Sequence, residues 1–322
     1  MITVFTPTYN RAHLLPRVYE SLCRQTFKDF EWVIVDDGSS DDTKSVVEKF
    51  SVLGFEFSGD KAQPFNPQPS PLTPDFKTQN SKLKTNSIRY FYQENGGKHR
   101  AINRGVQEAR GELFFIVDSD DWLPDDALKI VAQQYEYIKG DASFAGVVGL
   151  DCFSDGRVVA SNTFYEVLEC SEIDFRNKYH VKGDMKEVFR IDVLREIPFP
   201  EIEREKFCPE DLVWHRIARK YKFRYFNQVI YSVEYQPTGL SSSLRRLRMN
   251  SPYASVIHYS EYNEFDISTK QKIRNAINYW RFWFCLPDNR KRSGETPKLC
   301  WLWFWTKPIG WFMHLNDLRL TK

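Results

Sequence analysis

Three carboxylates and one hydroxyl occur in four consecutive residues in the first half of the chain: Asp118, Ser119, Asp120 and Asp121. Carboxylates this close raise one another's pKa unless a cation lies among them. Their oxygens suit a hard divalent ion such as Mg²⁺ or Mn²⁺, and phosphate oxygens can complete its coordination. The cluster therefore predicts a metal site for a phosphorylated ligand, with an exposed acidic turn that caps the next helix as the alternative.

An apolar run at residues 113–117 precedes this cluster and is typical of a buried strand. Similar runs lie at residues 2–5, 32–35 and 88–92, and the predicted helices between the runs are 14–25, 42–50 and 98–109. This alternation predicts an α/β fold with a mostly parallel central sheet and flanking helices. Ligands bind such sheets at the carboxyl ends of the strands, which is where the acidic cluster lies.

Polar motifs also follow the first two predicted strands. The sequence TPTYNR after the first strand contributes the candidate ligand-binding residues Pro7, Thr8, Tyr9 and Arg11. After the second strand, Asp36 and Asp37 can accept hydrogen bonds from a base or a ribose. Asp41 and Asp42, further along the same motif, are expected only to cap the next helix.

A glycine turn follows the third predicted strand and opens a helix, in the sequence NGGKHRAINRG. Its backbone amides and basic side chains can face phosphate, and Gly97, Lys98 and Asn103 are the candidates. A generic turn at a helix start is the alternative. The position of the motif after a strand favours the phosphate interpretation.

The ordered motifs PTYNR, VDDGSSDDT, NGGKHRAINRG and VDSDDWL resemble those of family 2 glycosyltransferases with a GT-A fold, over about residues 1–125. The resemblance implies an inverting enzyme that uses a nucleotide-diphosphate sugar, with a UDP-sugar as the expected donor. It places Pro7, Tyr9 and Asp37 near the nucleotide base. It also makes Asp118 and Asp120 the DxD pair, with Asp120 as the principal ligand of Mn²⁺ or Mg²⁺.

An inverting transfer also needs a carboxylate that removes the proton from the attacking acceptor hydroxyl. The sequence FCPEDLVW at residues 207–214 resembles the ED motif of the family. By that match Asp211 is the base, Glu210 orients the site or meets the acceptor, and Trp214 lines the acceptor side. The alternative is that the acids only form a favourable first helical turn.

The expected domain organisation is a GT-A catalytic domain over residues 1–250 and a helical extension over residues 251–322. A polar stretch at residues 53–87 is predicted to be an insertion. It is either a disordered loop without a function of its own or a loop that binds a partner or covers the acceptor. Further predictions are a helix at 124–138, strands at 145–150 and 158–160, a helix at 210–220, and edge strands at 223–226 and 229–235.

The last 53 residues combine aromatic and basic side chains with few acidic ones. The tryptophans are Trp280, Trp283, Trp301, Trp303, Trp305 and Trp311. This combination is typical of a segment at an anionic membrane interface, and a core helix or a dimer face is the alternative. The run at 299–305 is too short to span a bilayer. A membrane surface is therefore an expected partner of residues 270–322, and homo-oligomerisation is the competing expectation.

Composition excludes several classes of protein. The formal charge of +2, from 45 basic and 43 acidic residues, argues against a nucleic-acid partner. Six cysteines without a CxxC pair indicate neither zinc nor a disulfide framework. The first residues, MITVFTPTYNR, are typical of a strand and turn rather than a signal peptide. A cytoplasmic protein, peripheral on the cytoplasmic membrane face, is the expectation.

These features together predict transfer of a sugar to a glycan or to a polyprenyl-diphosphate-linked acceptor, in the assembly of a surface polysaccharide or glycoconjugate. A metal-dependent nucleotidyl or phosphoryl transferase would share the acidic site. It would also need a phosphate-binding loop, and the sequence contains no GxxxxGK[ST]. A non-catalytic protein that binds sugar nucleotides is the third alternative.

Overall fold

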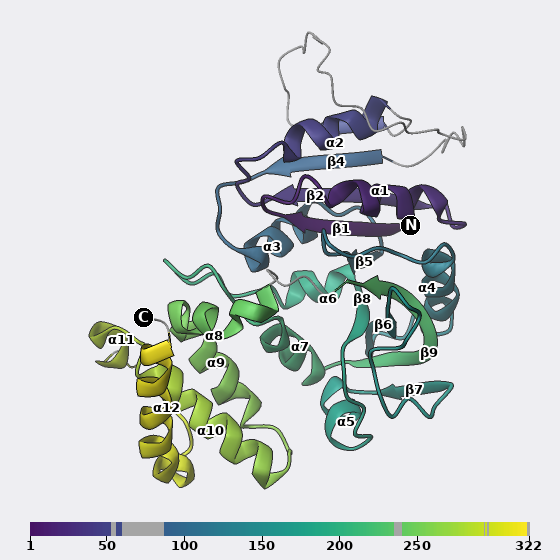
Figure 1. Ribbon diagram of the computed structural model, residues 1–322. Coiled ribbons are helices and arrows are strands. Elements are labelled where there is room, and N and C mark those ends of the chain that lie inside the picture. The colour runs from purple at the N-terminus through teal and green to yellow at the C-terminus, as the bar shows by residue number, and fades with distance from the viewer. Residues whose placement is uncertain (53–55, 60–86, 235–239, 293, 295, 321–322) are drawn as a thin grey trace.

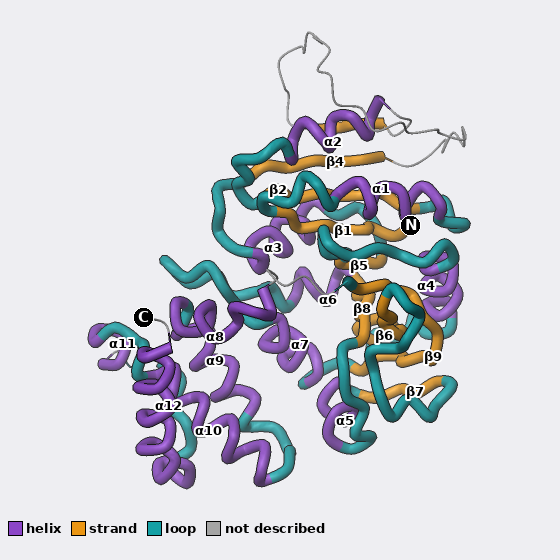
Figure 2. The backbone as a smooth tube through the Cα atoms, in the orientation of Figure 1, coloured by secondary structure: helices purple, strands orange, loops and turns teal. Residues whose placement is uncertain are grey.

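The computed structural model describes residues 1–52, 56–59, 87–234, 240–292, 294 and 296–320. The fold is built around one nine-stranded sheet with the strand order β3-β4-β2-β1-β5-β8-β6-β9-β7 (Figure 1). Helices α8 to α12 gather on one side of the sheet domain (Figure 2). The α/β fold with flanking helices and a helical extension is thus confirmed.

The first half of the sheet is parallel. Its strands are β1 (Ile2–Thr8), β2 (Phe30–Asp36), β3 (Glu56–Gly59), β4 (Ser87–Tyr92) and β5 (Leu113–Ile116). All seven residues of β1 and all seven of β2 are buried, as expected for parallel strands that helices cover on both faces. The carboxyl ends of β1, β2, β4 and β5 consequently meet at one edge of the sheet. The four strands predicted from the sequence are present, and they are parallel as predicted.

The second half of the sheet is mixed. β6 (Phe144–Phe153), β7 (Val167–Cys170), β8 (Met185–Arg190) and β9 (Lys222–Val233) continue the sheet beyond β5. β8 is antiparallel to both β5 and β6, β9 is parallel to β6, and β7 is antiparallel to β9. This arrangement brings the end of β9 back toward β5, close to the acidic cluster.

Helices cover both faces of the sheet. One apolar core lies beneath α1 (Leu15–Arg24), α2 (Thr43–Val52) and α4 (Ala127–Glu136). The core on the opposite face packs against α3 (Lys98–Glu108), α5 (Glu172–Asn177), α6 (Ile191–Glu196) and α7 (Glu210–Ala218). Because α3 and α7 share one face, the two predicted helix-start motifs lie on the same side of the sheet.

The C-terminal helices have an apolar core of their own. They are α8 (Leu240–Asn250), α9 (Pro252–Tyr262), α10 (Thr269–Trp283), α11 (Asp288–Arg292), the 3-10 helix η1 (Trp301–Thr306) and α12 (Lys307–Leu320). They pack in the order α7, α9, α10 and α12, so α12 is the outermost of these four. Among the described residues, no helix has the length and apolarity needed to cross a bilayer.

Three sequence predictions need correction. Residues 223–226 and 229–235 are not two edge strands, because β9 runs through Asn227 and Gln228 and irregular pairing with β6 absorbs the polar pair. Residues 158–160 contribute only an isolated bridge between Val158 and Cys152. Within the predicted insertion, 56–59 form edge strand β3, while 53–55 and 60–86 lie outside the described residues.

Candidate active site

Two loops at the carboxyl edge of the sheet are tied together. The loop after β1 contains Asn10, whose backbone N–H donates to the Ser39 hydroxyl at 2.8 Å in the loop after β2. The Asn10 side chain in turn accepts from the backbone of Ser40 at 2.8 Å. Tyr9 beside it is half exposed, which leaves its ring free to meet a ligand from solvent. The structure thus brings the first two predicted motifs together.

The two aspartates after β2 are both buried and hold neighbouring loops. Asp36 accepts from the Tyr90 hydroxyl at 2.6 Å. Asp37 accepts from the backbone N–H groups of Gly96 at 2.9 Å and Gly97 at 2.7 Å. Both carboxylates therefore hold neighbouring loops of the site in place. A direct contact of either one with a nucleotide base stays a prediction.

The glycine turn at the start of α3 depends on Gly97. Its φ of +99° is in the left-handed region, and a Cβ there would lie 1.9 Å from the carbonyl oxygen of Lys206. Only glycine satisfies both constraints. The turn therefore packs tightly against the segment that precedes α7, and this brings Lys98 close to the start of that helix.

Lys98 joins the two halves of the site. Its ammonium lies 2.7 Å from Asp118 Oδ1, after β5, and 2.9 Å from Glu210 Oε1, at the start of α7. Burial opposes the charged form of Lys98, but the two carboxylates outweigh it and raise its pKa. Burial likewise pushes the pKa of Asp118 upward, and the positive charges of Lys98 and Lys186 lower it overall. One cation thus connects the predicted donor side to the predicted acceptor side.

Asp121 is a structural member of the acidic cluster. Tyr231, near the end of β9, donates to Asp121 Oδ2 at 2.8 Å and accepts from the backbone N–H of Asp118 at 2.9 Å. The backbone N–H of Glu234 also donates to Asp121. Burial and the nearby charge of Asp118 raise the pKa of Asp121 to about 7. Both oxygens of Asp121 are therefore engaged in holding the loop.

Asp120 has the carboxylate best placed to accept a metal. It is one quarter exposed, and its ion pair with Arg11 is long, at 4.0 Å. Within the described residues, no group of three or more His, Cys, Asp or Glu side chains is arranged to hold an ion. Mg²⁺ commonly binds through one or two carboxylates together with substrate phosphates, so Asp120 with Asp118 fits an ion that the donor's diphosphate completes.

Asp211 lies in the first turn of α7, next to Glu210. Although its side chain is exposed to solvent, protein atoms crowd around it, and this partial desolvation raises its pKa. The charges of Arg248 and Arg176 oppose the rise. A carboxylate of this kind remains open to a substrate and binds a proton more strongly than an ordinary aspartate does, which suits a general base.

Two of the predicted residues lie elsewhere. The Asn103 amide donates to the Phe199 carbonyl at 2.9 Å and to Glu201 at 2.8 Å, so it supports the loop before α7. Trp214 is buried and packs against Phe189, with 4.4 Å between the ring centroids. Its ring therefore belongs to the apolar core, although helical spacing puts positions 211 and 214 on the same side of α7.

The remaining predicted residues lie at the ends of β1 and β5. Pro7 and Ser119 are buried there. Thr8 is also buried, and its hydroxyl has no hydrogen-bond partner among the described residues. A buried hydroxyl without a partner at the carboxyl end of a strand is available to a ligand or to water.

Two residues of the site, Lys186 and Tyr231, were not predicted from the sequence. Tyr231 orients the acidic loop through its hydrogen bond to Asp121. The ammonium of Lys186, on β8, lies 3.9 Å from the centre of the Tyr231 ring. Both come from the second half of the sheet, more than 60 residues after the acidic cluster. In the sequence, each is a single residue within a strand. Without the order of strands in the sheet, neither can be distinguished from an ordinary strand residue.

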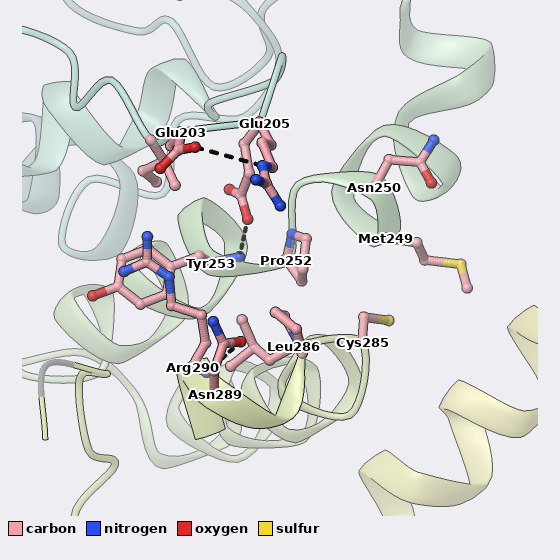
Figure 3. A pocket seen from close by; sticks show the side chains of 13 residues that line it. Glu203, Glu205, Met249, Asn250, Pro252, Tyr253, Cys285, Leu286, Asn289 and Arg290 are labelled. Carbon is pink, nitrogen blue, oxygen red and sulfur yellow. Dashed lines mark hydrogen bonds and ion pairs between the residues drawn. The ribbon is translucent and has the colours of Figure 1, made fainter. Parts of the chain in front are cut away.

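A pocket of about 420 Å³ is a separate feature (Figure 3). It lies between residues 202–205 before α7, the start of α9 and the turn between α10 and α11. Glu205 closes one side by accepting from the backbone N–H of Tyr253 at 2.8 Å. No predicted site residue lines this pocket, so it marks the junction between the sheet domain and the C-terminal helices.

Replacing Lys98 with methionine is expected to leave Asp118 and Glu210 without their shared cation. The free energy of unfolding should fall by about 1–2 kcal/mol, less than for fully buried ion pairs because all three side chains are partly exposed. Urea unfolding at neutral pH measures this. Lys139→Met is the matched control, since Lys139 also pairs with two carboxylates but lies on the surface away from the site. Equal effects of the two substitutions would contradict the special position of Lys98.

Comparison with known proteins identifies the family. The model for glycosyl transferase family 2 matches residues 3–59 and 73–189, which together are more than half of the chain. The chain belongs to this family. The family predicted from the four ordered motifs is thereby confirmed.

Two curated relatives show the range of similarity. The GalNAc(5)-diNAcBac-PP-undecaprenol beta-1,3-glucosyltransferase of Campylobacter jejuni is 28% identical over 228 residues, which are 69% of this chain and 61% of that protein. The poly(ribitol-phosphate) beta-N-acetylglucosaminyltransferase TarS of Staphylococcus aureus is 28% identical over 205 residues, 62% of this chain and 29% of that protein. The chain thus spans less than two thirds of the length of either relative.

Solved structures confirm the GT-A fold. The crystal structure of S. aureus TarS 1-349 in complex with UDP-GlcNAc matches 98% of this chain and 80% of that one, with a TM-score of 0.56 and 20% identity. The mannosyltransferase PcManGT from Pyrobaculum calidifontis, in complex with GDP-Man and Mn²⁺, matches 100% of this chain and 75% of that one, with a TM-score of 0.52 and 17% identity.

Proposed function

We propose that this chain is an inverting glycosyltransferase that takes a sugar from a UDP-sugar and transfers it to a hydroxyl of a glycan carried on polyprenyl diphosphate. The observation that carries the proposal is the contact of Lys98 with both Asp118 and Glu210. It brings the strand-end carboxylates and the start of α7 into one site, as a transfer between a donor and an acceptor requires.

In the proposed reaction, Asp211 accepts the proton of the acceptor hydroxyl. The hydroxyl oxygen forms a bond to the anomeric carbon of the donor sugar while the bond from that carbon to the diphosphate oxygen breaks on the opposite face. The nucleoside diphosphate leaves with the bonding electron pair. Lys98 and Arg11 are two side-chain cations of the site that can bind its phosphates.

A divalent ion held by Asp120 and Asp118 would supply Lewis-acid stabilisation of the charge that develops on the leaving diphosphate. The structure of PcManGT with GDP-Man and Mn²⁺ supports a divalent ion in a related fold, and that of TarS with UDP-GlcNAc supports a UDP-sugar donor. The polyprenyl part of the proposal is supported by the printed name of the C. jejuni relative, whose acceptor carries PP-undecaprenol.

A donor panel tests this function. With Mn²⁺ present, we expect one or a few of UDP-glucose, UDP-galactose, UDP-GlcNAc, UDP-GalNAc and GDP-mannose to raise the melting temperature, because a ligand at 100 times its Kd stabilises by about 2.7 kcal/mol. The product that accompanies turnover should be a nucleoside diphosphate. Release of pyrophosphate would instead indicate a nucleotidyl transferase, and a panel without any binding would contradict the proposal.

A further inference from the structure

Large apolar side chains cover the outer surface of η1 and α12. Trp301 is 77% exposed and Phe312 is 69% exposed. The other large apolar residues exposed on these two elements are Leu302, Phe304, Trp305, Ile309, Trp311, Leu318 and Leu320. We call these nine residues the aromatic face. Single exposed apolar residues are ordinary, but nine of them within positions 301–320 on two consecutive elements mark an interaction surface.

The inner side of α12 is fixed firmly against α10. A Cβ on Gly310 would lie 2.5 Å from Cβ of Trp280, so the two helices approach closely at this glycine. Asp317 is buried and forms a two-pronged ion pair with Arg281, with one contact of 2.6 Å. The aromatic face is therefore presented by the packing of the fold and does not belong to a loosely attached helix.

The structure also narrows the predicted interfacial segment. Trp280 is buried in the core of the C-terminal helices, and Trp283 packs against the same core. Both tryptophans were part of the predicted segment 270–322, but they stabilise the bundle from inside. The surface available to a partner is thus the one formed by residues 301–320.

Charges around the aromatic face are positive. Lys298 and Arg319 are exposed, and Lys307 is partly exposed, with its ammonium 5.0 Å from the centre of the Trp280 ring and 5.8 Å from that of Phe304. The single acidic residue between positions 296 and 320 is Asp317, whose charge Arg281 and Arg245 offset. Apart from Asp317, the charged side chains between positions 296 and 320 are consequently all positive.

We propose that the aromatic face docks this protein on an anionic lipid bilayer, with the indole rings at the headgroup level and Lys298, Lys307 and Arg319 against lipid phosphates. Tryptophan prefers the membrane interface, and anionic lipids attract basic segments. A second copy of the chain fits less well, because a two-fold contact would bring the same positive charges together. The inference rests on the proposed function in that docking would place the site beside a lipid-linked acceptor.

Vesicle sedimentation tests the docking surface. Full-length protein should bind vesicles of phosphatidylcholine that contain phosphatidylglycerol, and it should bind pure phosphatidylcholine at least about tenfold more weakly because the attraction of anionic lipid for the three basic residues is lost. The double substitution Trp301→Ser, Trp305→Ser should lower partitioning to the anionic vesicles by at least about tenfold, since two large aromatic side chains no longer enter the interface.

The double substitution Tyr137→Ser, Phe164→Ser is the matched control. These side chains are 74% and 95% exposed but lie on the sheet domain, so vesicle binding should not change. Equal loss in both double variants, or no binding by the unaltered protein, would overturn the proposal. A dimer in light scattering that dissociates in Trp301→Ser, Trp305→Ser would overturn it too, in favour of a second copy.

The vesicles contain neither donor nor acceptor, so their result is independent of the proposed activity. Binding to donor without binding to vesicles would remove the membrane surface and keep the glycosyltransferase. Binding to vesicles without binding to any donor would do the reverse.

Discussion

Replacing Asp211 with asparagine is expected to lower kcat by about 10²- to 10⁴-fold, the usual contribution of a positioned general base. Donor binding should stay within about twofold of the original value, because the side chains proposed to bind the phosphates are Lys98 and Arg11, and Asp211 is not among them. The amide cannot accept the proton of the acceptor hydroxyl, while its size and hydrogen-bonding shape remain close to those of the carboxylate.

Asp192→Asn is the control for the Asp211 substitution. Asp192 is also an acid in the first turn of a helix, α6, but it is exposed and pairs with Arg190 away from the site. Its replacement changes a favourable helix-start charge without changing the site. If Asp192→Asn lowered kcat as much as Asp211→Asn, or if Asp211→Asn abolished donor binding as well, the role of Asp211 as base would be wrong.

The pH dependence of kcat/KM checks the same residue. Because desolvation raises the pKa of Asp211, the base becomes protonated at a higher pH than an ordinary aspartate would. Activity should therefore fall with decreasing pH along a limb displaced upward from about pH 4. Asp121, with a pKa of about 7, also titrates in this region, so the limb should persist in Asp121→Asn if it belongs to Asp211.

The meeting of the strand-end motifs at one edge of the sheet could be predicted from the sequence because strand order along the chain fixes it. Parallel strands place their carboxyl ends at one edge, so motifs that follow β1, β2, β4 and β5 must come together whatever the details of the helices. This holds for Asp118 and Lys98, which lie 2.7 Å apart although 20 positions separate them. Strand periodicity and turn residues were sufficient to locate both.

The rest of the site depends on long-range packing. Tyr231 reaches Asp121 only because β9 pairs with β6 in the mixed half of the sheet, 110 positions from the carboxylate. Asp36 and Asp37 carry the residue types of a ligand site, yet their oxygens are engaged by Tyr90 and by the glycine turn. Residue type and position at a strand end therefore located these acids, but their hydrogen-bond partners could not be read from the sequence.

The acceptor side shows the same limit. Trp214 lies one turn after Asp211 on the same helix, and helical spacing alone cannot say whether an aromatic ring faces solvent or the sheet. Its burial against Phe189 of β8 is decided by the antiparallel strand that separates β5 from β6. That strand was not among the predicted elements, so the sequence offered no surface for the ring to pack on.

Replacing Asp120 with asparagine is expected to weaken donor binding in the presence of Mn²⁺ and to lower kcat by about 10²-fold or more, equivalent to roughly 3 kcal/mol of lost stabilisation of the leaving diphosphate. Asparagine keeps one oxygen but loses the negative charge that a hard cation requires. Asp125→Asn is the control, since Asp125 follows the same cluster but is exposed and pairs with Arg24 at 2.9 Å.

Calorimetry of donor binding with Mn²⁺ and with EDTA separates the role of the ion from that of the cations in the chain. The unaltered protein should bind donor more weakly in EDTA, whereas Asp120→Asn should bind equally weakly in both conditions because it no longer holds the ion. A variant that kept the full response to EDTA would move the metal to Asp118. If EDTA had no effect on the unaltered protein, Lys98 and Arg11 alone would have to neutralise the diphosphate, and Asp118, held 2.7 Å from Lys98, would then serve to position that lysine.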